Sequence, residues 1–109
     1  MRRIYHLVLR ASWEKDTPSS YRPISLETEG FIHCSNADQV AGAANRFYAN
    51  AADLLVLHID PALLTSPLRD EAASNGELFP HIYGPIGPTA IVAIEILRRG
   101  PDGAWVFRT

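Results

Sequence analysis

Four histidines, each set among apolar neighbours, are the residues of this chain best suited to chemistry. They are His6, His33, His58 and His81. A buried imidazole must be hydrogen-bonded, bound to a metal or kept for a ligand, because burying an unpaired polar group is costly. The pattern therefore predicts either a ligand site or a set of satisfied buried histidines.

The first motif is Gly-Phe-Ile-His-Cys-Ser at residues 30–35. Extended geometry places His33 and Ser35 on one face, where a strand passes into a helix. Backbone N–H groups at a helix N-terminus favour anions such as phosphate. Ser35 is predicted to cap the helix, with Asp38 completing an acidic variant of the capping box. Whether His33 binds a ligand or only a backbone carbonyl is left open.

The second motif is Leu-Phe-Pro-His-Ile-Tyr-Gly-Pro at residues 78–85, where His81 and Tyr83 share a face. Its prolines and glycines suggest a rigid segment that shapes a pocket wall, although Tyr83 could equally be core. The acids nearest this motif that could face the pocket are Glu71 and Glu77.

The remaining candidates carry less weight. His6 lies in the middle of a predicted strand and becomes a site candidate only because His33 and His81 need partners. His58 is explained by a local pair with Asp60, one step along the same face. Cys34 should be buried and unreactive, pointing away from His33. The histidines form no close pair in the sequence, so no metal is expected.

Composition restricts the class of protein. The 109 residues make one domain, residues 1–109, with 47% hydrophobic and 20% charged residues and a net charge of −2. Basic residues are dispersed, so nucleic acid is not an expected partner. A single cysteine fits a reducing compartment, and no apolar stretch approaches the ~20 residues of a membrane span. We expect a cytoplasmic protein without a membrane partner, and oligomeric state is left open.

Periodicity predicts about five or six strands around one main helix. The strands are expected at 3–10 (an internal strand), 30–35, 54–59, 90–97 and 104–108, the last after a Pro-Asp-Gly turn. The helix is expected over about 36–50, and its apolar face consists of Val40, Ala43, Ala44, Phe47 and Ala51. Gly42 inside it is explained by close packing against a neighbouring element. Irregular segments are predicted at 11–29, at 78–84 because of its prolines, and as an exposed loop after a turn at 61–64. The fold class is α+β, with a split, mainly antiparallel sheet.

Four segments together resemble an uncharacterised bacterial family called domain of unknown function 952. They are IYHLV, SLETEGFIHCS, LHID and GELFPHIYGPI, which span nearly the whole chain. The resemblance implies a compact relative of the ADP-ribosyltransferase fold, a split α+β sheet with an NAD-binding cleft.

The same resemblance suggests residue roles. His6 matches the position of a first-strand histidine that bonds a ribose hydroxyl, and Tyr48, or less readily Phe47, matches an aromatic that stacks on nicotinamide. Transferases of that fold also place a glutamate on a later strand to steady positive charge at the ribose carbon. No glutamate is expected on a strand in that context here, so Glu71 is the best substitute and Glu77 the second.

The leading hypothesis is a small protein that recognises NAD or an ADP-ribose-type nucleotide in a cleft lined by histidines. NAD would be its substrate, with cleavage or transfer at the anomeric carbon; whether the protein is catalytic is left open. The cleft residues would be His6, His33, Ser35, Tyr48, His81 and Tyr83. The alternative is a non-catalytic module that binds a small metabolite or a protein through a degenerate transferase cleft. A third reading, a metal-dependent hydrolase, is less favoured.

Overall fold

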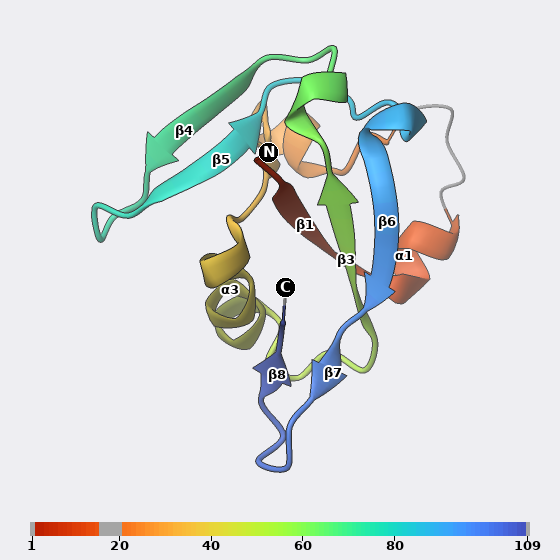
Figure 1. Cartoon of the computed structure of the whole chain (residues 1–109), viewed down its shortest axis with the longest axis vertical. Helices are drawn as coiled ribbons and strands as arrows, with labels where there is room; N and C mark the ends of the chain where they lie inside the picture. The colour runs from red at the N-terminus through yellow and green to blue at the C-terminus, as the bar shows by residue number, and fades with distance from the viewer. Residues whose placement is uncertain (1, 16–20, 109) are drawn as a thin grey trace.

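Two three-stranded antiparallel sheets and a small hairpin form the framework of the protein (Figure 1). The computed structural model describes residues 2–15 and 21–108. The first sheet has the order β1-β3-β6, from Ile4–Leu9, Leu54–Ile59 and Ile91–Ile96. The second has the order β2-β5-β4, from Ile32–His33, Leu78–Ile82 and Leu68–Ala72. The hairpin pairs β7, Arg98–Arg99, with β8, Trp105–Val106.

One main helix accompanies these strands. It is α3, Val40–Phe47, and two shorter helices are α1, Arg10–Lys15, and α2, Ser25–Thr28. Single 3-10 turns lie at Ala37–Gln39 (η1), Pro61–Leu63 (η2) and Pro88–Ala90 (η3). The predicted α+β class with mostly antiparallel sheets and one main helix is confirmed. Segment 11–29 is less irregular than predicted, since it holds most of α1 and all of α2; residues 16–20 lie outside the described residues.

β1 and β3 of the first sheet are covered on both faces, as their apolar character predicts. Ile4 and Val8 of β1 belong to a core cluster shared with the second sheet, whereas Tyr5 and Leu7 belong to a cluster packed against α3 and β8. The strand is not internal, however. β3 is central, and β1 lies at the edge, where a single bridge joins its backbone to Ser35 within residues 2–15 and 21–108, through Tyr5 N–H to Ser35 O at 2.9 Å and Ser35 N–H to Tyr5 O at 2.7 Å.

That bridge changes where the helical segment begins. The backbone of Ser35 is used by β1, so the chain turns one residue later and Ser35 is not the cap. Asn36 precedes η1, and its N–H donates to the side chain of Gln39 at 2.8 Å, which closes a capping box. The predicted Ser35–Asp38 box is therefore wrong by one residue.

The end of the helix also differs from the prediction. Periodicity predicts Phe47 on the apolar face, but its side chain is 68% exposed, and the guanidinium of Arg46 lies 5.1 Å from its ring. Tyr48, the next residue, packs against the core cluster instead. Close packing does not explain Gly42, because nothing lies within 4 Å of the position that its Cβ would take.

The exposed loop predicted before residue 78 contains a strand, β4. Its sequence, Leu-Arg-Asp-Glu-Ala, has no apolar alternation, because β4 is an edge strand of which only Leu68 packs against the core. β5 is regular despite Pro80. The Pro80 carbonyl accepts the Cys34 N–H at 3.0 Å. The backbone nitrogen of Pro80, which has no hydrogen to donate, therefore also faces Cys34, where β2 has already ended and no ladder bond is lost.

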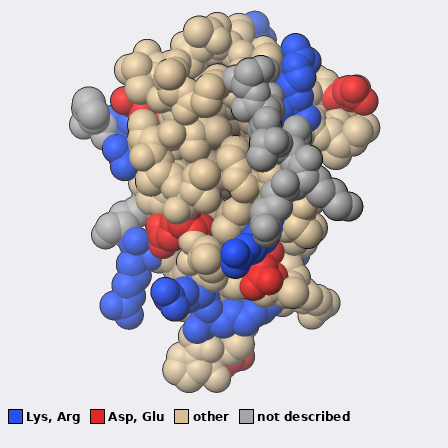
Figure 2. Space-filling view, turned by 90° about the vertical axis from the view of Figure 1, so that its right-hand side faces the viewer, with Lys and Arg blue, Asp and Glu red and all other residues tan. Residues whose placement is uncertain are grey.

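The opposite edge of the framework is apolar. Val92, Ile94 and Ile96 of β6 are 42%, 50% and 51% exposed, on an edge strand that carries one acidic residue, Glu95. Figure 2 shows this side of the molecule as a largely uncharged surface with basic residues gathered below it. The core is therefore covered less completely at β6 than at the central strand, where Leu57, opposite Ile94, is fully buried.

Gly84 provides a test of the junction after β5. Its φ is +155°, and an added Cβ would lie 2.4 Å from the Ser66 hydroxyl oxygen and 2.9 Å from the Ser66 Cβ. We expect Gly84→Ala to lower the free energy of unfolding by about 1–3 kcal/mol. Gly42→Ala is the matched control, and it should raise stability by roughly 0.5–1 kcal/mol because it removes a helical glycine from open space. Urea unfolding of both variants checks this, and equal effects of the same sign would contradict it.

Candidate functional site

The outward face of the second sheet gathers most of the chemistry-bearing side chains. Strand alternation sends Ile32 and Ile82 into the core and their neighbours outward. We call the outward surface the histidine face; it consists of Phe31, His33, Arg69, Glu71, His81 and Tyr83. Its central row is in register across three strands, because His81 lies opposite His33 on one side and Arg69 on the other.

Phe31 is the centre of the ring contacts on this face. Its ring stacks on His81 with centroids 4.1 Å apart and an interplanar angle of 19°. It also contacts His33 at 4.8 Å and Tyr83 at 5.4 Å. The His33 and His81 rings meet edge to face at 5.4 Å. The two sequence motifs are thus brought together, as the histidine pattern suggested.

Glu71 is held on the histidine face by two donors. Its Oε1 accepts a hydrogen bond from His81 Nδ1 at 2.8 Å and a short one from the Tyr83 hydroxyl. The Tyr83 hydroxyl, and then the His81 ring, lower the pKa of Glu71. The same hydrogen bond to Glu71 raises the pKa of Tyr83. The result is an oriented carboxylate whose side chain remains 36% exposed and therefore reachable by a ligand.

Two further charges border this face. Glu29, at the end of α2, pairs with His33 through Oε2 and Nε2 at 2.9 Å, and both side chains are about half exposed. The guanidinium of Arg69 lies 5.1 Å from the Tyr83 ring centroid. Sequence reasoning did not select Glu29, Phe31 or Arg69 as site residues. The alternation that set Phe31 beside His33 was a usable signal, but Arg69 required the strand β4.

His6 lies behind this face, not on it. Its ring is buried, with Nδ1 2.6 Å from the His33 carbonyl oxygen and Nε2 3.0 Å from the Tyr21 hydroxyl. A carbonyl only accepts, so Nδ1 carries the proton; in the neutral ring, Nε2 then accepts from the tyrosine. Burial lowers the pKa of His6 to about 4. Contact with a ribose would require breaking one of these bonds, and that role of His6 stays a prediction.

The other predicted residues lie apart from the histidine face. Ser35 is buried in the bridge to β1. Tyr48 packs in the cluster on the opposite side of the first sheet, where its carbonyl accepts the Trp105 indole N–H at 2.8 Å and burial raises its pKa. Glu77 lies between β4 and β5 and accepts from the Gln39 amide at 3.1 Å. Of the two predicted acids, only Glu71 contacts the histidines.

His58 is paired with a carboxylate, but not with the predicted one. Its Nε2 lies 2.8 Å from Glu95 of the adjacent strand β6. The predicted partner, Asp60, instead accepts the Ala62 N–H at 3.0 Å at the start of η2. A contact across strands cannot be seen in local sequence spacing.

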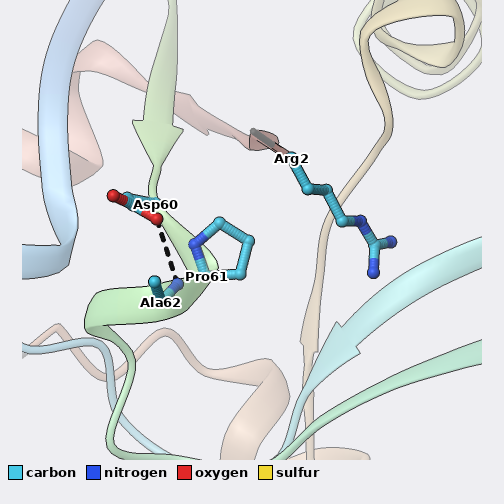
Figure 3. A pocket seen from close by; sticks show the side chains of 4 residues that line it. All are labelled: Arg2, Asp60, Pro61 and Ala62. Carbon is cyan, nitrogen blue, oxygen red and sulfur yellow. Dashed lines mark hydrogen bonds between the residues drawn. The ribbon is translucent and has the colours of Figure 1, made fainter.

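A small hollow lies away from the histidine face (Figure 3). Arg2, Asp60, Pro61 and Ala62 line it, and its volume is ≈ 130 Å³, below the ~300 Å³ at which ligand pockets begin. The Arg2 guanidinium is bound by Asp70 at 2.6 Å. Because Asp70 and Glu71 are successive residues of β4, they point to opposite faces. The hollow is too small for a nucleotide.

Within residues 2–15 and 21–108, no three or more His, Cys, Asp or Glu side chains are arranged to hold a metal ion. None of the helices described there is long and apolar enough to cross a membrane.

Comparisons with known proteins identify relatives but no activity. A family model described as "Protein of unknown function (DUF952)" matches residues 7–94. The crystal structure of protein CC0527 from Caulobacter crescentus is similar, with 27% identity, a TM-score of 0.82, and coverage of 95% of this chain and 93% of that one. The solution NMR structure of CC0527 is similar too, with 27% identity, a TM-score of 0.80, and coverage of 95% of this chain and 91% of that one. No curated protein matches the chain significantly.

The buried His6 predicts a pH dependence of stability. A histidine of the unfolded chain takes up a proton near pH 6.5, whereas folded His6 does so at about 4. Between these values the unfolded state binds more protons, so the contribution of His6 is complete above pH 6.5 and is lost as the pH falls towards 4. The shift corresponds to on the order of 3 kcal/mol. Urea unfolding between pH 7 and 4 should show a smaller loss in His6→Asn than in the parent; identical losses would contradict the assignment.

Removing the phenol that donates to Glu71 should change the titration of that acid. In Tyr83→Phe we expect the pKa of Glu71 to rise towards the ordinary glutamate value, because the main cause of its lowering is gone. Carboxyl carbon NMR measures this directly. Tyr48→Phe, on the other side of the first sheet, is the matched control. An unchanged Glu71 titration in Tyr83→Phe would show that the hydrogen bond does not form in solution.

Proposed function

The chain belongs to the DUF952 family of proteins of unknown function, and we propose from its own geometry that the histidine face binds NAD or an ADP-ribose-type nucleotide. The observation that carries the proposal is the Glu71 carboxylate, fixed by His81 and Tyr83 at the side of the Phe31 ring cluster. This arrangement places an oriented negative charge beside flat aromatic surface.

The ring cluster supports recognition of a flat heterocycle. Adenine and nicotinamide bind proteins by stacking on aromatic or imidazole rings, in offset or edge-on geometry. Phe31 already stacks on His81, which shows that the spacing of β2 and β5 accommodates parallel rings. His33 remains 55% exposed at the rim and offers a ring edge to a ligand. Under the proposal, Phe31 takes the stacking role that was first expected of Tyr48.

The carboxylate supports chemistry at the ribose carbon. Cleavage of the nicotinamide–ribose bond builds positive charge at the anomeric carbon, as in glycoside hydrolysis, and a fixed carboxylate stabilises such a charge. Oε1 of Glu71 accepts from both His81 and Tyr83, whereas Oε2 accepts no hydrogen bond from the described residues. In the ADP-ribosyltransferase-like reading, Glu71 on β4 would fill the role of the later-strand glutamate.

A non-catalytic binding module is the competing proposal, and one observation favours it. Two hydrogen bonds already offset the charge of Glu71, which leaves less of it to act on a ligand. The same rings would then recognise a nucleotide or a related metabolite without turnover. Binding and cleavage therefore have to be measured separately.

Calorimetric titration tests recognition. The folded chain should release or take up measurable heat with NAD and with ADP-ribose at millimolar ligand or below, and Phe31→Ala should weaken binding roughly tenfold because it removes the stacking surface. Phe47→Ala is the matched control, since Phe47 is exposed on α3 and off the histidine face. Absence of heat with both ligands, with the fold verified by circular dichroism, would reject the nucleotide proposal.

Nicotinamide release from NAD tests catalysis. Glu71→Gln keeps an oxygen that can accept from His81 and Tyr83 but removes the charge, so turnover should fall about 100-fold or more while NAD affinity changes little. Glu77→Gln, in the segment between β4 and β5, should leave turnover unchanged. Binding without any nicotinamide release in the parent chain would favour the non-catalytic module.

A further inference from the structure

His33 and His81 form a cross-strand pair on the histidine face, and each has one ring nitrogen that the proposed nucleotide function does not use. They lie directly opposite each other on β2 and β5, and their ring centroids are 5.4 Å apart. Two side chains in that register project from the same face of the sheet and can reach a common point above it. Imidazole is the nitrogen ligand that zinc, nickel and copper ions prefer in proteins.

Each of the two rings has a carboxylate at one nitrogen only. Glu71 accepts from His81 Nδ1 at 2.8 Å, and Glu29 accepts from His33 Nε2 at 2.9 Å. In the neutral rings the proton is therefore on the nitrogen that faces the acid, and the lone pair is on the other one. Neither His81 Nε2 nor His33 Nδ1 has a hydrogen-bond partner among the described residues. Carboxylate support of the second nitrogen is the usual arrangement around metal-bound histidines, since it fixes the tautomer and raises ligand basicity.

The positions of the His33 and His81 rings, and the charges around them, are compatible with one metal ion bound by both. Two nitrogens bound to a tetrahedral zinc at 2.0–2.1 Å lie roughly 3.3 Å apart, closer than the present ring centroids. His81 is held by Phe31 and is 15% exposed, whereas His33 is 55% exposed and can turn towards it. Glu29 and Glu71 carry two negative charges against the one positive charge of Arg69, which lies opposite His81, so the net charge around the pair is negative and favours a cation.

We propose that His33 and His81 together bind a divalent transition-metal ion of the zinc and nickel class. Water completes the coordination, because no third His, Cys, Asp or Glu within the described residues joins the pair into a full set of ligands. Such a site holds its metal exchangeably, unlike a closed structural zinc site. The inference does not rest on the proposed nucleotide function, although a metal here would occupy part of the same face.

The test is a zinc titration by calorimetry on the full chain without an affinity tag, after metal removal and in a non-chelating buffer. We expect one saturable site with a dissociation constant in the micromolar range, and a loss of at least about tenfold in affinity in His33→Asn and in His81→Asn. His58→Asn is the matched control, because His58 has the same kind of carboxylate partner, Glu95 at 2.8 Å, but no second histidine opposite. It should bind like the parent.

Glu29→Gln adds a second readout that leaves both ligands in place. It removes the acceptor charge at His33 and should weaken zinc binding severalfold without unfolding the chain, because Glu29 is 49% exposed. If His81→Asn fails to fold, His33→Asn and Glu29→Gln still decide the question. No saturable binding up to about 1 mM zinc, full affinity in His33→Asn, or an equal loss in His58→Asn would overturn the proposal. A failure to bind NAD would not affect it.

Discussion

The buried imidazole of His6 joins the two sheets on which the rest of the structure depends. It stands on β1 of the first sheet and donates to the backbone of His33 in β2 of the second. β2 has only two residues, so its ladder to β5 is short and cannot by itself fix where Phe31 and His33 lie. The bridge between Tyr5 and Ser35 adds two backbone bonds at the same joint. The joint favours neutral His6, because burial disfavours a charged ring and lowers the pKa of His6 to about 4.

The environment gives the same residue type three different roles in this chain. His6 is buried with both nitrogens bonded inside the protein, and it is a structural residue. His58 is half-buried between Tyr5 and Glu95 on the first sheet. His33 and His81 each have one ring nitrogen bonded to a carboxylate and the other without a hydrogen-bond partner among the described residues. Burial and register separate these roles, since all four histidines have similarly apolar neighbours in the sequence.

The parts of the fold with strong apolar patterns could be predicted, and those held by polar contacts could not. β1, β3 and β6 were found because they bury continuous or alternating apolar runs. Alternation also correctly placed His33 beside Phe31 and His81 beside Tyr83. An edge strand with one core residue carries no periodic signal, so the sequence predicts a loop in place of β4 and assigns Glu71 to that loop. The cap at Asn36 and the partner of His58 depend on pairing between distant segments, which local spacing does not encode.

β4 has fewer buried residues than the strands of its own sheet, and this bears on the proposed function. It packs against the core through Leu68, and its other ties are the ladder to β5 and polar contacts on either face. One of these, between Arg2 and Asp70, is solvent-exposed, and such pairs contribute about 0–1 kcal/mol. Glu71, on the other face, is bonded to His81 and Tyr83 of the neighbouring segment. Elements with few buried apolar contacts open locally at lower free energy than the core, and ligand-binding segments are commonly drawn from them. The residue proposed to act on a ligand thus lies on an edge strand with one core contact, while Phe31 and His33, beside it on the same face, belong to the segment that His6 ties to the first sheet.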